Sequence, residues 1–567
     1  MTRLLTLLIS SILILTGCVI QPITPMGEEI NDEEEITIDF SRTVIVNTPH
    51  NEPTTPCEDT FIAHDLDHIT TVIGDVVRLY DSNGSGLAIN DLDNDGDLDI
   101  VLGNLAGANA IFWNEGGADT FPIFSKEELL LGRTRSINIV DFDGDGWQDI
   151  VFARQQARPT LWRNVGIAEG DTQPIFEDVK TTDLWVNAFT TSWADLNGDG
   201  DLDMVAASYD TEYTRGDPGA SGGGGVAVFD NQGAGDTYES EGLAFSTQAL
   251  AILLEDINDD GAVDVLVGND FFLKDLVWLQ QDGAWEEIDP FPVMSMNTMS
   301  YATGDVNNDG QRELFAGDML PYQADEKTMS KWMPVVEHIE MIPGDPQIMA
   351  NVLHVYDTDN QENLAFVNQA EALGIAAAGW SWSAQFGDLD NDGLLDLYIV
   401  NGMNAEELFA HLPGNELVEE NLVFRNEGDD GFVVQDWGLN STLSGRSMSM
   451  ADLDQDGDLD IVVNNLLGPA QIFENRLCGG DGLTVDLHWS SSQNTRAVGA
   501  TVMLHTSDGV YQRDVRTASG YLSGVPAQVH FGVPEGSVVE ALEIVWPDGE
   551  VTMVEDITTG MLVSVTR

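Results

Sequence analysis

The chain has 567 residues, enough to bury a large core, and its 97 acidic and 22 basic residues give a formal net charge of −75. This charge disfavours nucleic acid and anionic membrane surfaces as partners. A hydrophobic content of 43% and 56 glycines, with only short strand-like runs, indicate an all-β globular protein rather than a disordered chain.

The N-terminus carries the pattern of an export signal. Arg3 is followed by an apolar run at residues 4–15, which is too short to span a bilayer, and then by Thr16-Gly17-Cys18. This pattern resembles a bacterial lipoprotein signal peptide, in which Cys18 becomes the lipidated first residue. An ordinary secretory signal with an incidental cysteine is the alternative. We expect a signal peptide at residues 1–17 and an exported protein, lipid-anchored at the bacterial cell surface, outer membrane or periplasm.

Residues 18–56 are predicted to form an acidic, proline-containing tether. If flexible, this segment reaches roughly 35 Å. Residues 36–40 and 44–46 are rich in β-formers and are alternative short strands. The two remaining cysteines, Cys57 and Cys478, lie on either side of the repeats described next. An oxidising compartment would allow them to form a disulfide, and two free buried thiols are the alternative.

A nine-residue loop recurs seven times between these cysteines. Each copy has an oxygen-bearing side chain at positions 1, 3, 5 and 9 and glycine at position 6. Such spacing around a sharp turn suits a hard cation such as calcium, and the variable position 7 suits a residue that contributes its backbone carbonyl. We expect several calcium ions, up to one per repeat. The predicted ligands are Asp91, Asp93, Asp95, Asp97 and Asp99 (loop 1); Asp141, Asp143, Asp145, Trp147 and Asp149 (loop 2); Asp195, Asn197, Asp199, Asp201 and Asp203 (loop 3); Asp256, Asn258, Asp260, Ala262 and Asp264 (loop 4); Asp305, Asn307, Asp309, Gln311 and Glu313 (loop 5); Asp388, Asp390, Asp392, Leu394 and Asp396 (loop 6); and Asp452, Asp454, Asp456, Asp458 and Asp460 (loop 7).

Two other interpretations of these loops fit the sequence less well. An EF-hand has a bidentate glutamate at position 12 and flanking helices, whereas position 12 of loop 1 is Leu102 and each loop runs into an apolar, β-rich stretch. A set of solvated acidic turns is disfavoured, because like-charged carboxylates a few Å apart repel one another. The loops are therefore predicted to be calcium-binding hairpin loops.

The spacing of the repeats predicts the architecture. Successive loops begin 50, 54, 61, 49, 83 and 64 residues apart, which fits one four-stranded blade per repeat. The predicted fold is all-β, with a seven-bladed β-propeller at residues 57–477 and a small β domain at residues 478–567. Most third strands are expected to end in an aromatic-x-Asn signature such as Trp162-Arg-Asn164, and the fourth repeat has Trp278-Leu-Gln280 instead. The aromatic residues are expected to pack between blades.

Two segments resemble known families. The repeats resemble the FG-GAP/VCBS type of integrin-alpha-like β-propellers, in which calcium sits in the hairpin between the first two strands of a blade. The C-terminal part resembles the ASPIC/UnbV domain at residues 494–502, 520–523, 530–533 and 544–549. This order is that of the cartilage acidic protein 1-like family, and it implies an extracellular calcium-binding interaction protein. Within the C-terminal domain, His530 is expected to form a structural hydrogen bond.

The long fifth interval indicates an insertion at about residues 319–367. Residues 323–333 have a helical pattern that Pro334 is expected to interrupt. Lys327 and Lys331 give this segment a distinct local charge, and a passive cap over the channel is the alternative.

The sequence contains no recognised catalytic or cofactor-binding motif. We expect a monomeric cell-surface binding, adhesion or protein-interaction module whose partner is an extracellular protein or glycan. Its only membrane contact is the lipid anchor, and an enzyme is the less favoured class. Two alternatives stay open. One is a lectin that stacks sugars on Trp380 and Trp382, and the other is a calcium-dependent polysaccharide lyase or hydrolase that uses Arg133 and Arg135.

Overall fold

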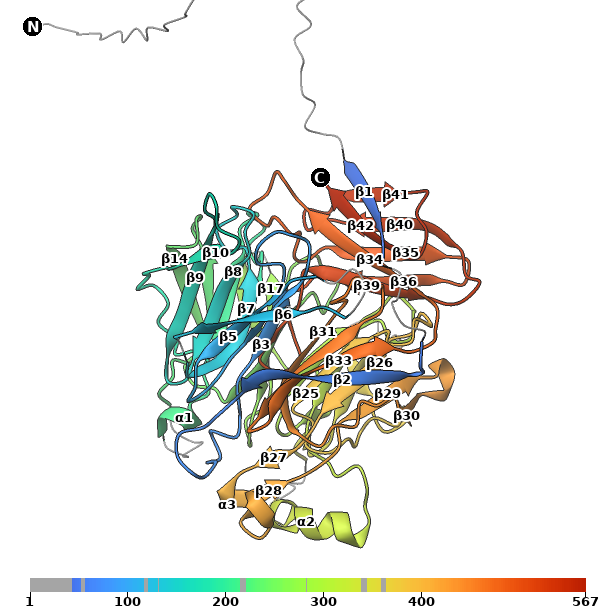
Figure 1. The fold of residues 1–567 in the computed structure, drawn as a ribbon. Coiled ribbons are helices and arrows are strands. Elements are labelled where there is room, and N and C mark those ends of the chain that lie inside the picture. The colour runs from blue at the N-terminus through green and yellow to red at the C-terminus, as the bar shows by residue number, and fades with distance from the viewer. Residues whose placement is uncertain are drawn as a thin grey trace, which may run out of the picture. The chain divides into compact units, whose positions relative to one another are not determined.

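The computed structural model describes residues 43–51, 57–116, 121–130, 132–214, 221–281, 283–337, 344–357 and 364–567. The predicted signal peptide, Cys18 and residues 36–40 lie outside these ranges. Strands dominate the described residues (Figure 1), and the α-helices among them are α1 (Thr211–Thr214), α2 (Glu326–Val336) and α3 (Glu406–Phe409). The all-β prediction is confirmed. No helix in the described ranges is both long and apolar enough to cross a membrane.

Seven sheets in this part of the chain each hold one copy of the repeat, whose own strands pair antiparallel, and we number the sheets like the loops. In every sheet, position 1 of the loop directly follows the first strand and position 9 begins the second strand. The strands are β3 (Leu87–Asn90), β4 (Asp99–Leu102), β5 (Asn109–Asn114) and β6 (Phe124–Leu129) in sheet 1; β7 (Thr134–Val140), β8 (Asp149–Arg154), β9 (Ala157–Ile167) and β10 (Pro174–Asp178) in sheet 2; β11 (Thr190–Ala194), β12 (Asp203–Ala207), β13 (Val226–Asn231) and β14 (Tyr238–Ala244) in sheet 3; β15 (Ala249–Glu255), β16 (Asp264–Asn269), β17 (Leu276–Gln281) and β18 (Ala284–Ile288) in sheet 4; β20 (Ser300–Gly304), β21 (Glu313–Gly317), β23 (Val352–Tyr356) and β24 (Phe366–Asn368) in sheet 5; β25 (Ser383–Gly387), β26 (Asp396–Val400), β29 (Leu422–Asn426) and β30 (Phe432–Gln435) in sheet 6; and β31 (Ser444–Ala451), β32 (Asp460–Leu466) and β33 (Pro469–Arg476) in sheet 7.

The sheets follow one another in chain order. The first strand of each sheet contacts the first strand of the next, and β31 of sheet 7 contacts β3 of sheet 1. Strands β7, β11 and β31 are buried at every residue, whereas the fourth strands β6 and β10 are mostly exposed or half-buried. These first strands are covered on both faces, so the polar residues that they carry, such as Arg135 and Asn138 in β7 and Arg446 in β31, are buried as well.

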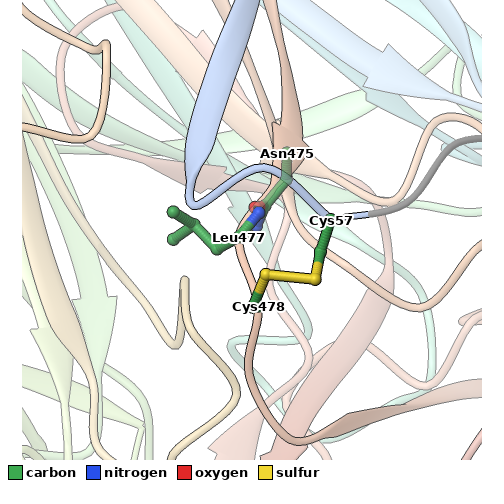
Figure 2. Close-up of a disulfide and its surroundings, with 4 residues drawn as sticks. All are labelled: Cys57, Asn475, Leu477 and Cys478. Carbon is green, nitrogen blue, oxygen red and sulfur yellow. A yellow bond between two sulfur atoms is a disulfide. The ribbon is translucent and has the colours of Figure 1, made fainter.

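Sheet 7 is completed by the N-terminal segment. Strand β2 (Thr60–Ile69) pairs antiparallel with β33, and Thr60 lies opposite Arg476. Cys57 precedes β2 and Cys478 follows β33. The structure joins the two cysteines in a disulfide, with their Cα atoms 5.2 Å apart (Figure 2).

Peptide mapping under non-reducing conditions is expected to find Cys57 joined to Cys478. The cross-link closes a loop with a sequence separation of 421 residues, so it restricts the unfolded chain. In the chain-entropy model a loop of this length contributes about 6 kcal/mol, and the double variant Cys57→Ser/Cys478→Ser should lose up to that much unfolding free energy in urea. Full labelling of both thiols in the unreduced, denatured protein would contradict the pairing.

The C-terminal domain consists of two four-stranded sheets around one apolar core that includes Leu483, Phe531 and Trp546. One sheet has the order β1-β42-β34-β39, and its first strand, β1, lies within the predicted tether. This placement agrees with the alternative in which residues 44–46 form a strand. The strands are β1 (Val44–Pro49), β34 (Asp481–His488), β39 (Gln528–Val533) and β42 (Met561–Thr566) in this sheet, and β35 (Thr501–Thr506), β36 (Val510–Asp514), β40 (Val539–Val545) and β41 (Val551–Val554) in the other.

Residues 516–524, which we call the axial segment, leave this domain and contact all seven sheets. Strand β38 (Ser523–Gly524) pairs parallel with β3 and contacts β7 and β31, and its antiparallel partner is β37 (Ala518–Ser519). The other sheets are contacted by hydrogen bonds to Trp193 in sheet 3, Leu254 in sheet 4, Tyr301 in sheet 5 and Ser383 in sheet 6.

Tyr521 is the central side chain of the axial segment. It is fully buried, and its ring lies 5.2 Å from that of Trp382 and 6.4 Å from that of Phe189, measured between centroids. Its hydroxyl donates to the Asn83 carbonyl at 2.9 Å. The C-terminal domain thereby contributes Tyr521 and Leu522 to a core cluster whose other members come mostly from the sheets and the loops between their strands.

The insertion carries helix α2, which begins after its N-cap Asp325. The prediction that Pro334 interrupts the helix is wrong, because α2 continues to Val336. Pro334 lies in the last turn, so its missing N–H removes only one bond near the helix end. Trp332 of α2 is buried and stacks on Trp380 at 5.4 Å. Figure 1 shows α2 and α3 next to β27 (Met403–Asn404) and β28 (Glu416–Leu417). Strands β19 (Met294–Ser295) and β22 (Gln347–Ile348) form a separate two-stranded sheet.

Candidate metal centres

All seven loops share one backbone conformation. The glycine at position 6 has φ between +86° and +96° in every loop, a region that residues with a Cβ rarely adopt. Position 4 also has positive φ throughout, and it is occupied by Gly, Asn, Asp or Gln. The turn therefore requires glycine at position 6 and a residue that tolerates positive φ at position 4.

The loop carboxylates hold this turn by accepting backbone N–H groups. In loop 2, Gly146 N donates to Asp141 Oδ2 at 2.9 Å, and Trp147 N donates to Asp145 Oδ1 at 2.9 Å. The position 6 to position 1 bond recurs in the other six loops. The position 7 to position 5 bond recurs in them too. Each acidic side chain thus keeps further oxygen lone pairs for another partner.

The position 9 carboxylate links the loop to its own sheet. In loop 2, Asp149 Oδ2 accepts from Phe142 N at 3.0 Å, and Asp149 Oδ1 accepts from Asn164 N at 2.7 Å. The bond from position 2 is present in all seven loops. The bond from the third strand is found in loops 1, 2, 3, 4, 6 and 7.

The amide residue of the third strand also ties neighbouring sheets together. Asn164 of sheet 2 donates from Nδ2 to the Leu92 carbonyl in loop 1 at 2.8 Å, and Asn114 of sheet 1 donates to Leu453 in loop 7 at 3.0 Å. Sheets 3, 4, 6 and 7 make the corresponding bond to the preceding loop. Gln280 keeps this donor in sheet 4. The role of this amide was not predicted from the sequence, where only the aromatic residue of the signature has an expected role.

The structure brings together acidic side chains in four loops. Carboxylate oxygens lie within 4.8 Å of one another at positions 1, 3 and 9 of loops 1, 2 and 6, and at positions 1, 3 and 5 of loop 7. Position 7 and the remaining acidic positions are not in these clusters. Loops 3, 4 and 5 have asparagine at position 3 (Asn197, Asn258 and Asn307), whose amide oxygen is also a calcium ligand.

The chemistry of the four clusters fits a hard cation. Each contains one buried carboxylate oxygen with no hydrogen-bond donor among the described residues: Asp91 Oδ1, Asp143 Oδ1, Asp390 Oδ1 and Asp454 Oδ1. A buried, unsatisfied anionic acceptor is costly unless a cation meets it. An all-oxygen donor set suits calcium or magnesium and does not suit thiophilic metals.

Proton affinity in the loops is raised in the absence of a cation. Burial raises the pKa of Asp99, Asp203 and Glu313, all at position 9, to about 8. In loop 7, burial and then the neighbouring carboxylate of Asp454 raise the pKa of Asp456 to about 10. Protons therefore partly take the place that a metal ion would take.

The metal-stripped protein is expected to lose stability as pH rises from about 4 to 8. Over this range the native state binds more protons than the unfolded chain, whose carboxyl pKa values lie near 4, so a rise in pH favours unfolding. Four buried histidines act in the opposite direction below about pH 6.5, because burial lowers the pKa values of His50 and His530 to about 4, that of His354 to about 3 and that of His68 below its ordinary value, but the acidic groups with raised pKa values outnumber them. Asp486 and Asp514 also act in the opposite direction, below about pH 4, because Arg496 and Arg312 lower their pKa values against the effect of burial. Urea denaturation after removal of divalent ions, at pH 5 and pH 7.5, tests this. A larger unfolding free energy at pH 7.5 would contradict it.

The structure also places the residues proposed for the alternative functions. Trp380 and Trp382 are each only 3% exposed, so neither presents a ring to a sugar. Arg133 is exposed, whereas Arg135 is buried, pairs with Glu212 and donates to the Gly84 carbonyl at 2.6 Å. The two arginines therefore do not form a basic pair in a groove. His530 Nε2 lies 2.9 Å from the Gly457 carbonyl, a structural contact of the expected kind.

Both the repeats and the C-terminal part of the chain match models of known protein families. Residues 490–567 match the family model of ASPIC and UnbV, and residues 91–152, 141–206 and 256–316 match the FG-GAP-like repeat. Among solved structures, BBS1N in complex with ARL6DN has a TM-score of 0.40 and 9% identity, with 73% of this chain and 96% of that chain covered. A lectin from Agrocybe aegerita has a TM-score of 0.34 and 14% identity, with 69% and 90% covered.

Curated relatives match most of the chain at low identity. Cartilage acidic protein 1 of Mus musculus is 22% identical over 516 residues, covering 83% of this chain and 72% of that protein. The Homo sapiens protein of the same name is 23% identical over 531 residues, covering 86% and 72%. The chain therefore carries FG-GAP-like repeats followed by an ASPIC and UnbV domain, and it is a distant relative of cartilage acidic protein 1.

Proposed function

We propose that the chain is an exported, calcium-stabilised seven-bladed β-propeller, at residues 57–477, that serves as a cell-surface binding module. In this proposal the seven sheets are the blades. Support comes from the contacts between successive first strands, the contact between β31 and β3, and the strand that the N-terminal segment adds to sheet 7. The C-terminal domain at residues 478–567 supplies the axial segment.

The observation that carries the calcium assignment is the repeated loop geometry. The same glycine conformation and the same carboxylate-to-backbone bonds occur in seven loops, and four of these loops contain an unsatisfied buried carboxylate oxygen. Positions 1, 3, 5 and 9 and the position 7 carbonyl would hold the ion. Bound calcium would neutralise the clustered carboxylates and join the ends of the first and second strands of each blade.

The proposed role is binding rather than catalysis, because the clustered carboxylates of the loops are assigned to metal binding. With a net charge of −75, the surface favours partners that are neutral, basic or bridged by calcium. We propose an extracellular protein or glycan as the partner of a monomeric module.

Parallel arrays of glycans and of exported proteins from the source cells, probed in calcium and in EDTA, test this role. We expect calcium-dependent binding to a protein. Binding to a single glycan class would favour the lectin alternative. No calcium-dependent binding on either array would contradict the module proposal.

Anchoring through Cys18 is part of the same proposal. The substitution Cys18→Ser removes the cysteine that lies three residues after the apolar run, so the protein is expected to move from the membrane fraction to the soluble fraction. Cell fractionation followed by immunoblotting measures this, with Cys57→Ser as the control for loss of a cysteine. Unchanged membrane partitioning of the Cys18 variant would contradict lipid anchoring.

A further inference from the structure

The residue just before the third-strand amide borders the metal loop. It is Arg163 in sheet 2, Asp230 in sheet 3 and Arg425 in sheet 6, and each contacts a position 3 or position 5 side chain of its own loop. In sheet 7 the equivalent residue is Glu474, whose charge acts on Asp454. The charge at this one position therefore differs from loop to loop.

In loops 2 and 6 this residue is an arginine, and its guanidinium directly contacts side chains that are predicted metal ligands. Arg425 Nε donates to Asp390 Oδ2 at 2.6 Å, and Arg425 Nη2 donates to Asp392 Oδ2 at 2.5 Å. Asp390 is at position 3 and Asp392 at position 5. Arg163 forms an ion pair with Asp143, also at position 3, and donates to the Ala234 carbonyl. Both arginine side chains are only about one quarter exposed, at 27% for Arg163 and 26% for Arg425.

We propose that Arg163 and Arg425 are built-in counter-ions that hold the position 3 carboxylates of loops 2 and 6 when calcium is scarce. Each guanidinium holds Oδ2 of its position 3 carboxylate, next to the Oδ1 that has no donor, so its positive charge opposes a calcium ion that approaches the same group. Loops 2 and 6 therefore fill last. This proposal rests on the proposed calcium sites and adds an order of loading to them.

Two other loops have the opposite neighbour. Asp230 accepts from Asn197 Nδ2 at 3.1 Å, so loop 3 has an additional carboxylate beside position 3. Glu474 brings a carboxylate near loop 7, although His64 and Arg476 already pair with it. The seven loops thus differ in the charge of the residue that precedes the third-strand amide. Loops 2 and 6 are the two in which this residue is an arginine, whose guanidinium contacts the loop.

Loop 2 offers a reporter for this order. Trp147 is the only aromatic residue at position 7 of the seven loops, next to a predicted ligand carbonyl. Tb³⁺ replaces calcium in oxygen-ligand sites, and a neighbouring tryptophan sensitises its luminescence. Excitation of tryptophan during a Tb³⁺ titration of the full mature protein therefore reports loop 2, and the variant Trp147→Phe identifies the part of the signal that comes from that loop.

The decisive comparison is Arg163→Gln against the parent protein. Removing the guanidinium is expected to lower the Tb³⁺ midpoint of the Trp147-dependent signal about tenfold, the size of effect expected for one like charge beside a partly exposed ion. Arg78→Gln is the matched control, because Arg78 pairs with Glu406 and Glu407 away from the loops and its loss changes the net charge equally. Its midpoint should stay within about twofold of the parent. Arg163→Lys, which keeps the charge, should do the same.

Each outcome decides a different claim. A Trp147-dependent signal with equal midpoints in Arg163→Gln and Arg78→Gln would overturn the counter-ion proposal and leave the calcium site intact. Absence of any Trp147-dependent signal in a folded parent protein would overturn the calcium site and the counter-ion proposal with it. If Arg163→Gln does not fold, an Arg163→Lys midpoint shifted as far as tenfold would overturn the charge argument.

Discussion

Removal of calcium is expected to lower the melting temperature of the folded chain by more than ten degrees. If each loop binds with a dissociation constant near 10⁻⁴ M, millimolar calcium stabilises each site by about 1.4 kcal/mol. Seven sites give ~10 kcal/mol as an upper value, because the sites need not be equal and the unfolded acidic chain also attracts calcium. This is comparable with the whole stability of a typical domain. Calorimetry in millimolar calcium and in excess EDTA measures the shift.

Single-ligand variants provide the internal control for this prediction. Asp143→Ala and Asp454→Ala should each remove about one site's share of the calcium-dependent stabilisation. The C-terminal domain is expected to unfold together with the seven sheets, because the axial segment is buried among them. Identical transitions in EDTA and in calcium would contradict a structural role for the ions.

The variant Tyr521→Ala is expected to lower the unfolding free energy by about 3 to 5 kcal/mol, the cost of removing a large, fully buried aromatic side chain. It removes the ring that packs against Trp382 and Phe189, and it leaves a cavity between sheets. Tyr521→Phe keeps the ring and loses only the bond to the Asn83 carbonyl, so it should cost about 1 kcal/mol. Urea denaturation of both variants measures the difference.

An equal and small effect of the two Tyr521 variants would contradict the central placement of this side chain. A matched control for loss of an aromatic ring at the surface is Phe245→Ala, since Phe245 is 96% exposed. That change should alter the unfolding free energy by no more than about 0.5 kcal/mol.

The loops and their place in the sheets could be predicted because both follow from local chemistry. Oxygen-bearing side chains at fixed spacing around a glycine demand one turn, and the apolar residues after position 9 demand a strand. The amide of Asn164 could have been found by the same route. Gln280 replaces asparagine at the corresponding position, and this change conserves the side-chain donor rather than the shape.

The axial segment could not be predicted in this way. Residues 520–523 contain a tyrosine and a leucine, which any small β domain could bury in its own core, so no periodicity indicates that they enter a different part of the fold. The same holds for β1, whose pairing with β42 depends on residues more than 500 positions apart. Non-local pairing of this kind is set by the assembled shape of both parts and not by the local pattern.

The calcium content of the mature protein tests the central claim most directly. Native mass spectrometry, or equilibrium dialysis against millimolar calcium followed by metal analysis, counts the ions bound per folded chain. The proposed sites predict up to seven calcium ions, with loss of one ion in Asp454→Ala and no loss in Arg78→Gln. A folded parent protein that binds no calcium under these conditions would contradict the proposal that the repeated loops are metal centres.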